Sequence, residues 1–241
     1  MQNYILTKVR LSWYFIGLLV IFLVVSFSLN KHTFTSGALT LFSVNSFLYG
    51  FYLAPIFSGQ KTRIEDMHKT VRNEANAIFA MVLRIKKMPD SLRNKLQAEF
   101  DQYLDTCIRQ RSIAQGEKEY EDLITYCVTY KGTHQEEVGK LLDQLVANQQ
   151  NRTQLSMLLS NKVYSHEWIV ILVLFSITIG FILTIDGGSD VVFTLIAAFL
   201  ATGLSMLVVM LAKFSTLTHK KAKAIWDPYK KLRATRYYRI D

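Results

Sequence analysis

Four long stretches of the chain contain no Asp, Glu, Lys, Arg or His, and they constrain the fold more than any other feature. They are residues 11–29, 33–60, 168–185 and 191–212. The hydrocarbon core of a bilayer is about 30 Å thick, a distance that about 20 apolar residues cross as a helix. Helices in the cores of soluble proteins rarely run so far without a charge. We therefore predict four membrane-spanning helices, which excludes a soluble enzyme, a disordered chain and a secreted disulfide scaffold.

The two windows nearest the N-terminus need separate comment. The first is too long for the apolar region of a signal peptide and ends in a poor cleavage site, Ser28-Leu29-Asn30, so we expect an uncleaved helix. The second is the most polar of the four, with Ser43, Asn45, Ser46 and Tyr49 inside it. We place its membrane part at about residues 38–57. A buried core helix is a stronger alternative here than in the other three windows.

The remaining sequence predicts an all-α protein, because the long middle segment shows helical periodicity and no strand pattern. The expected parts are an N-terminal arm (1–10), spans one and two (11–58), a cytoplasmic helical domain (59–165), spans three and four (166–213) and a basic cytoplasmic tail (214–241).

Apolar residues at spacings of three and four predict the helices of the middle domain. The first face comprises Met67, Val71, Ala75, Ile78, Val82, Ile85 and Met88, and the second comprises Leu92, Leu96, Phe100, Tyr103, Leu104 and Ile108, with a break at Pro89-Asp90-Ser91. A third helix is expected from about Gly116 to Tyr130. Thr133-His134-Gln135-Glu136 has the spacing of a capping box, which begins a fourth helix. No helix-breaking residue precedes Trp168, so we expect the fourth helix to run unbroken into the third span.

Basic residues set the expected orientation, since cytoplasmic loops are enriched in Lys and Arg. The arm carries Lys8 and Arg10, the link between spans one and two has only Lys31, and the link 186–190 has two acids and no base. After the fourth span come Lys213, Lys220, Lys221, Lys223, Lys230, Lys231, Arg233, Arg236 and Arg239. We therefore expect a multi-pass protein of the plasma (inner) membrane with both termini in the cytoplasm. The tail is expected to contact anionic lipid; it has no nucleic-acid-binding motif, so no nucleic-acid partner is expected.

Residue types that carry catalysis are present but not arranged for it. Five histidines (His32, His68, His134, His166 and His219) have no metal-ligand spacing with one another, with a cysteine or with a carboxylate. Cys107 and Cys127 form no CxxC motif, and we expect both to be reduced thiols in the cytoplasm. His166-Glu167 beside Trp168 is expected to be an interfacial polar pair. We expect no enzyme activity, no metal and no cofactor.

Two motifs resemble a known family. The stretch 46–53, SFLYGFYL, is similar to the SFxxGFYV stretch on the second span of bestrophin anion channels. The stretch 74–78, EANAI, followed by Leu83-Arg84, Met88-Pro89 and a Tyr-Leu-Asp at 103–105, resembles the bacterial bestrophin-like membrane proteins of unknown function. The layout of that family, two spans, a helical cytoplasmic segment and two more spans, matches this chain from about residue 5 to residue 215.

The resemblance implies a homo-oligomer, pentameric as in bestrophins, that conducts small inorganic ions such as chloride through a central pore lined by the second span. The apolar neck of bestrophins occupies positions i, i+4 and i+8 of that span. The last two positions match Phe47 and Phe51, and the first falls on Ser43, which makes the outer neck more polar. The acidic calcium clasp of animal bestrophins has no counterpart here, so no calcium gating is expected.

Helical spacing independently places Ser43, Phe47 and Phe51 on one face, with Gly50 and Ala54 beside them. We therefore assign these five residues as the candidate pore lining, with Lys61 and Arg63 near the inner mouth. The alternative for Phe47 and Phe51 is packing against other spans or lipid. The alternative function is a non-conducting membrane protein whose helical domain binds a partner in envelope maintenance or stress response.

The polar residues of the second motif form a candidate structural site. Glu74, Asn76 and Arg84 are polar positions on an otherwise apolar helix. Asn76 adjoins the apolar face at Ala75, so we expect it to be partly buried and hydrogen-bonded across a helix contact, the alternative being ordinary solvation on the helix surface.

The distribution of basic residues yields a first testable prediction. Reporter fusions at Ser189 should report the outer side of the membrane, and fusions after Asp241 should report the cytoplasm, because only the arm, the middle segment and the tail are rich in Lys and Arg. Paired alkaline phosphatase and fluorescent protein fusions measure this. A C-terminus on the outer side would contradict the predicted topology.

Overall fold

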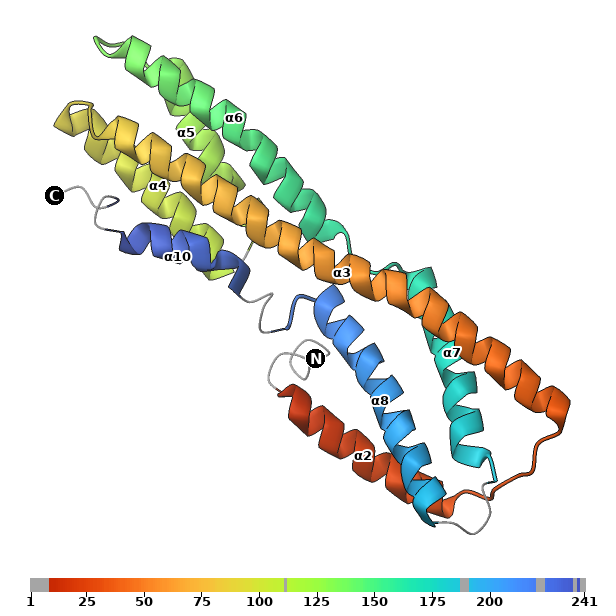
Figure 1. The fold of residues 1–241 in the computed structure, drawn as a ribbon. Coiled ribbons are helices and arrows are strands. Elements are labelled where there is room, and N and C mark those ends of the chain that lie inside the picture. The colour runs from red at the N-terminus through yellow and green to blue at the C-terminus, as the bar shows by residue number, and fades with distance from the viewer. Residues whose placement is uncertain (1–8, 111, 187–190, 220–223, 236–237, 239–241) are drawn as a thin grey trace. The chain divides into compact units, whose positions relative to one another are not determined.

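The structure is a computed structural model that describes residues 9–110, 112–186, 191–219, 224–235 and 238. These residues form helices, joined by short links, and the strand-like feature among them is one isolated bridge between His32 and Ile185. Four of the helices are long and apolar enough to cross a membrane, which confirms the expected all-α fold with four candidate spans (Figure 1). Lys8, the link 187–190 and the tail bases Lys220, Lys221, Lys223, Arg236 and Arg239 lie outside the described residues.

The chain divides into two compact units. The first comprises Met1–Thr62 and Lys162–Ala222, and the second comprises Arg63–Asn161 and Lys223–Asp241. The first unit contains the candidate spans: α2 (Leu11–Ser28), the first part of α3 (Ser36–Ile85), α7 (Ser165–Thr184) and α8 (Val191–Ser215). Pro55 lies inside α3, which continues past it as one helix of 50 residues.

Small side chains allow close helix packing in the first unit. α8 packs chiefly on α2, and its buried face carries Ala197, Ala198, Ala201, Thr202 and Ser205. Because lipid is as apolar as a leucine side chain, membrane helices gain stability from close van der Waals contact rather than from leaving water. Small residues on this face permit that contact. The Thr202 and Ser205 hydroxyls donate to carbonyls one turn earlier, Ala198 at 2.7 Å and Ala201 at 2.8 Å, so they leave no unpaired donor.

α3 packs on α7 and α8 through one of its faces. Tyr49 and Leu53 of α3 are buried against Ile171 and Leu211. Nearer the other end of the span, the Asn45 amide donates to the Thr178 hydroxyl at 2.9 Å and to the Leu174 carbonyl at 3.1 Å. The polar residues that made the second window unusual therefore include one that joins two spans by hydrogen bonds.

The link between α2 and α3 is fastened to the C-terminal end of α7. The backbone N–H of His32 donates to the Thr184 carbonyl at 2.8 Å, and Asp186 N–H donates back to the His32 carbonyl at 3.0 Å. The Lys31 ammonium donates to the Leu183 carbonyl at 2.8 Å. These bonds occupy carbonyls that the end of a helix leaves without partners.

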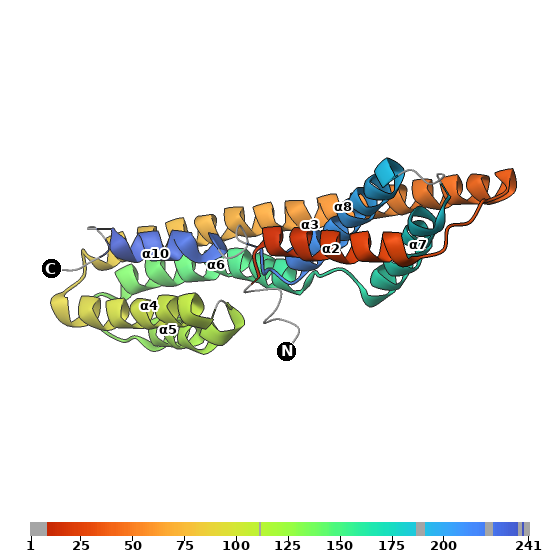
Figure 2. The same ribbon diagram turned by 90° about the horizontal axis from the view of Figure 1, so that it is seen from below.

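The second unit contains the rest of α3 together with α4 (Asp90–Gln110), the 3₁₀ turn η1 (Ala114–Gly116), α5 (Glu117–Thr129), α6 (Gln135–Ser160), the turn η2 (Ala224–Trp226) and α10 (Asp227–Ala234). Figure 2 shows α4 and α5 running alongside each other. The apolar face predicted from Met67 to Met88 is buried along its whole length. A break between the first two helices is present as predicted, but it lies at residues 86–89, since α3 ends at Ile85 and α4 already begins at Asp90.

The expectation of an unbroken fourth helix is wrong. α6 ends at Ser160, residues 161–164 are not helical, and α7 begins at Ser165. Tyr164 is extended, and its N–H donates to the Glu167 carboxylate at 2.8 Å, which stabilises the start of α7. Glu167 thus begins a helix, and the sequence alone offered no glycine or proline to mark the boundary.

The expected capping box is also wrong. α6 begins at Gln135, its N-cap residue is His134, and no side chain accepts a hydrogen bond at this cap. The first-turn acids Glu136 and Glu137 instead pair with Lys140, at 2.6 and 3.4 Å. Acids near a helix N-terminus are favoured by the helix dipole without any cap.

The close packing of α8 yields a second prediction. Ala201→Leu adds bulk on the fully buried face of α8, and overpacking of this kind costs about 1–3 kcal/mol. We expect a lower melting temperature in detergent, measured by tryptophan fluorescence. Gly203→Leu is the matched control, because nothing lies within 4 Å of a Cβ built at Gly203. Equal losses in the two variants would show that burial on this face does not limit stability.

Candidate functional site

The five candidate pore-lining residues lie on the face of α3 that the first unit leaves uncovered. Ser43, Phe47, Gly50, Phe51 and Ala54 are all exposed, whereas Tyr49 and Leu53 on the opposite face are buried. The side chains of Phe47 and Phe51 are 68% and 71% exposed, and their rings stack with centroids 5.9 Å apart. The structure thus brings the predicted set together as one continuous surface of one helix.

The two candidate inner-mouth bases differ in their surroundings. Lys61 is exposed. Arg63 is only 4% exposed, and its guanidinium donates to the Leu158 carbonyl at 2.6 Å and to the Leu159 carbonyl at 3.2 Å. These carbonyls belong to the last turn of α6, where a cation is favoured by the helix dipole. Arg63 therefore stabilises the C-terminus of α6 within the second unit, and Lys61 is the member of the pair that solvent reaches.

Glu74 lies at the centre of a buried polar cluster in the second unit. Its side chain is fully buried, and its two carboxyl oxygens accept hydrogen bonds from the hydroxyls of Tyr103 in α4 and Tyr229 in α10. Both tyrosines are also fully buried. Buried polar groups are costly unless paired. One side chain of α3 thereby joins two other helices by hydrogen bonds.

Arg152 of α6 completes this cluster. It is 1% exposed, lies over the Tyr120 ring at 3.7 Å from the centroid, and places its Nε 4.0 Å from Glu74. Its other nitrogens donate to the Glu117 carboxylate at 2.7 Å and to the Gln149 amide oxygen at 3.0 Å. Glu117 is therefore the closer acidic partner of Arg152, and Glu74 is the more distant one.

Burial has the largest effect on the pKa of Glu74. Desolvation raises the pKa of its carboxyl above the ordinary value, although the hydroxyls of Tyr103 and Tyr229 and the charge of Arg152 act in the opposite direction. The raised pKa agrees with the geometry, because Arg152 is already neutralised by Glu117 at the shorter distance. Burial likewise raises the pKa of the Tyr103 and Tyr229 hydroxyls.

The other two residues of the motif lie at the surface, and the expected burial of Asn76 is wrong. Asn76 is exposed, because the buried face of α3 turns through Glu74, Ala75 and Ile78 and leaves position 76 on its far side. Arg84 is partly exposed and pairs with Glu137 of α6 at 3.8 Å.

The tail contributes a helix that the charge pattern did not suggest. Ile225, Trp226, Tyr229 and Leu232 are buried in the second unit. Arg233 of the same segment donates to the Asp105 carboxylate of α4 at 2.6 Å. The four buried residues of this segment follow one another at intervals of one, three and three positions. This pattern is the signal that could have identified an amphipathic helix among the basic residues.

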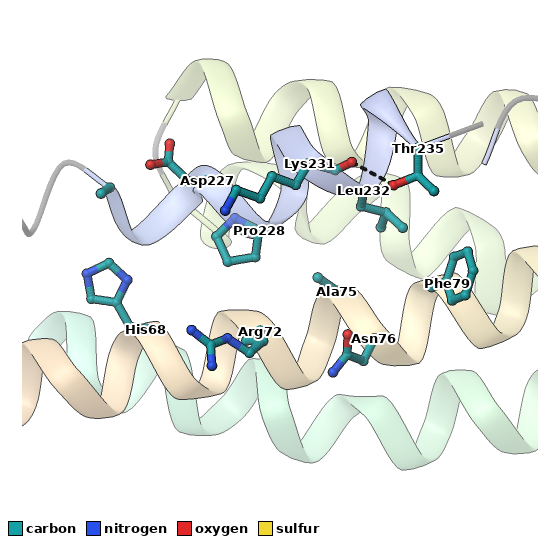
Figure 3. Close-up of a pocket in the computed structure, with 11 residues that line it drawn as sticks. His68, Arg72, Ala75, Asn76, Phe79, Asp227, Pro228, Lys231, Leu232 and Thr235 are labelled. Atoms are coloured by element: carbon teal, nitrogen blue, oxygen red, sulfur yellow. Dashed lines mark hydrogen bonds between the residues drawn. The ribbon is translucent and has the colours of Figure 1, made fainter. Parts of the chain in front are cut away.

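An open pocket lies between α3 and α10 in the second unit (Figure 3). Its volume is about 580 Å³. Its lining comprises His68, Arg72, Ala75, Asn76, Phe79, Ala224, Asp227, Pro228, Lys231, Leu232 and Thr235. The pocket thus combines apolar side chains with basic and amide groups.

The cysteines and acids provide little reactive chemistry in the described part of the chain. Cys107 and Cys127 are free and buried, and burial raises the pKa of their thiols to about 12 and about 11. A thiol with so high a pKa is a poor nucleophile at neutral pH. Among the described residues, no three His, Cys, Asp or Glu side chains are grouped to hold a metal ion.

Comparison with known proteins identifies one family. A family model described as the Bestrophin-like domain matches residues 11–219. This range includes all four candidate spans and the helical segment between them, and it confirms the family resemblance predicted from the sequence. No curated protein and no solved structure matches the chain.

The buried carboxyl yields a third prediction. A carboxyl whose pKa is higher in the folded than in the unfolded protein contributes most stability below its unfolded pKa, and loses it as the pH rises through the folded value. As the pH rises above about 4.3, the ordinary pKa of a glutamate side chain, the melting temperature of the wild type should therefore fall relative to that of Glu74→Gln, which cannot ionise. Thermal unfolding in detergent at a series of pH values measures the difference.

Glu65→Gln serves as the matched control, because Glu65 is an exposed residue of the same helix. Its melting temperature should follow the wild type at every pH. A wild-type protein that instead gains stability over Glu74→Gln as the pH rises would show that Glu74 is held as a carboxylate.

Proposed function

The chain belongs to the bestrophin-like family, and on that premise we propose that it is an oligomeric channel for small anions whose second span lines the pore. In this proposal it resides in the plasma (inner) membrane as a homo-oligomer, pentameric as in bestrophins. Both termini and the second unit lie on the cytoplasmic side. The family assignment supports a channel in general, and the arrangement of α3 supports the particular pore.

One observation carries the pore assignment. Within the first unit, α3 buries Tyr49 and Leu53 against other helices. Phe47 and Phe51, one turn apart, are exposed on its uncovered face. In a symmetric assembly each position of an axial helix forms a ring. The two phenylalanines would then form adjacent apolar rings, and Gly50 and Ala54 beside them would let the copies approach closely.

The chemistry of such rings suits a gate. A narrow apolar constriction stops ion flow by losing its water, without any charged residue. Ser43 lies one turn before Phe47. Its hydroxyl donates to the Leu39 carbonyl at 3.0 Å, so this donor is already used within its own helix. Lys61 follows the apolar part of α3 as its first charged residue, and a ring of exposed ammonium groups there would favour anions.

The proposal yields a fourth prediction. Changing both Phe47 and Phe51 to Ala widens the proposed constriction and removes its apolar side chains, so chloride efflux from proteoliposomes should increase. We expect a rise of about tenfold or more, which corresponds to a barrier to ion flow lowered by about 1.4 kcal/mol or more. Efflux is measured with a chloride electrode after addition of a potassium ionophore.

Phe27→Ala combined with Phe199→Ala is the matched control, because these two phenylalanines are also exposed but lie on α2 and α8. This control should leave efflux at the wild-type level. If neither the wild type nor the Phe47 and Phe51 variant conducts any ion, the channel proposal fails. The alternative of a non-conducting protein whose helical domain binds a partner would then take its place.

A further inference from the structure

The pocket between α3 and α10 is larger than a single inorganic ion would fill, and the side chains that line it carry a net positive charge. Its volume of about 580 Å³ lies within the range of about 300–1,000 Å³ typical of small-molecule sites. Arg72 from α3 and Lys231 from α10 bring positive charge to it. The size and the charge together indicate an organic anion rather than a single halide.

The acid in the lining does not cancel this charge. Asp227 accepts from the ammonium of Lys230 at 3.0 Å, and Lys230 is not part of the pocket lining. In Figure 3 the Asp227 carboxylate points away from Arg72 and Asn76. Arg72 and Lys231 both belong to the lining, and no acid among the described residues forms a salt bridge with either of them.

The hydrogen-bonding groups match an oxyanion. Arg72 is exposed, and a guanidinium presents several donors in a fixed plane that fits two oxygens of one phosphate. The Asn76 amide is exposed on the next turn of α3, and the His68 imidazole lies on the preceding turn. Arg72 and Asn76 therefore place donors on one wall of the pocket along about one turn of helix.

The wall formed by α10 is apolar in part, because Pro228 and Leu232 belong to the lining and Figure 3 shows them on the side of α10 that faces α3. Phe79 of α3 adds to this apolar surface. The Thr235 hydroxyl is used by its own helix, donating to the Lys231 carbonyl at 2.9 Å. A ligand with only a charged group would leave this apolar surface in water, whereas a ligand with an apolar part would cover it.

We propose that this pocket binds a phosphate-bearing small molecule, with the phosphate between Arg72 and Lys231 and its organic part on the apolar surface. Such a ligand bridges α3 and α10. The phosphate could belong to a soluble ester or to a lipid headgroup, since both present the same oxyanion. The proposal does not depend on ion conduction.

The test uses the full-length protein in detergent with phenyl phosphate as the probe, because it combines a phosphate with an apolar ring. Isothermal titration calorimetry should show saturable binding, weaker binding of inorganic phosphate and none of phenol. Arg72→Ala combined with Lys231→Ala should raise the dissociation constant at least about tenfold, the usual effect of losing a charge-assisted hydrogen bond.

Lys118→Ala combined with Lys131→Ala is the matched control, because it removes the same charge from exposed positions of the same unit. It should bind phenyl phosphate as the wild type does. Asn76→Asp provides a second variant at an exposed position, and its added negative charge should also weaken binding. Absence of saturable binding to the wild type, or equal losses in the control and the pocket variants, would overturn the proposal.

Titration in nanodiscs separates the two sources of phosphate. If the natural ligand is a lipid headgroup, phenyl phosphate should bind more weakly in phosphatidylglycerol and phosphatidylcholine discs than in dodecyl maltoside micelles, which contain no phosphate. Equal affinities in the discs and in the micelles identify a soluble phosphate ester as the ligand, with the site retained.

Discussion

The second unit depends on a carboxyl group placed where water cannot reach it. Glu74 projects from α3 into a core of aromatic and aliphatic side chains, and the Tyr103 and Tyr229 hydroxyls satisfy it from two other helices. A buried carboxyl without partners would destabilise the fold by more than most single apolar contacts stabilise it. The positions of α4 and α10 against α3 are therefore fixed by hydrogen bonding as well as by apolar packing, and the pocket beside Arg72 exists because α10 is held there.

The two units differ in the kind of polar side chain that they bury and in the partners of those side chains. In the first unit, polar side chains such as Asn45 and Thr178 pair with each other or with helix carbonyls between the candidate spans. In the second unit, Arg63 and Arg152 are buried and paired with carbonyls or carboxylates. Because a buried arginine without partners is strongly unfavourable, each of these residues specifies which helix ends and faces meet.

The sequence predicted the elements well and the polar contacts poorly. Runs without charge located the spans, and the three-and-four spacing located the buried face of α3, because burial of apolar area dominates both signals. Arg152 was missed although it continues the spacing of Leu141, Leu145 and Asn148 on α6. An arginine in an apolar stripe is interpreted as the end of the buried face unless its acidic partner is known. The partners of Arg152 could not be identified from the sequence, because Glu117 and Glu74 are 35 and 78 residues away from it. For the same reason Asn76, which adjoins an apolar face, was predicted to be partly buried, whereas Glu74 is the polar residue of the motif that is buried. The face of Phe47 and Phe51 was identified from spacing and resemblance, but a single chain cannot supply the symmetric copies that would surround it.

The separation of Glu74 from Tyr229 along the chain has a consequence for biosynthesis. The two residues are 155 positions apart, so Glu74 is translated well before Tyr229. At about 5–20 residues per second, a ribosome needs roughly 8–30 s to add the interval between them. During that time the nascent helices can assemble around Glu74 with only one of its two tyrosines. A chain whose synthesis stops short of Tyr229 retains an incompletely paired acid in its core, and such a chain offers proteases a way to distinguish truncated products from finished ones.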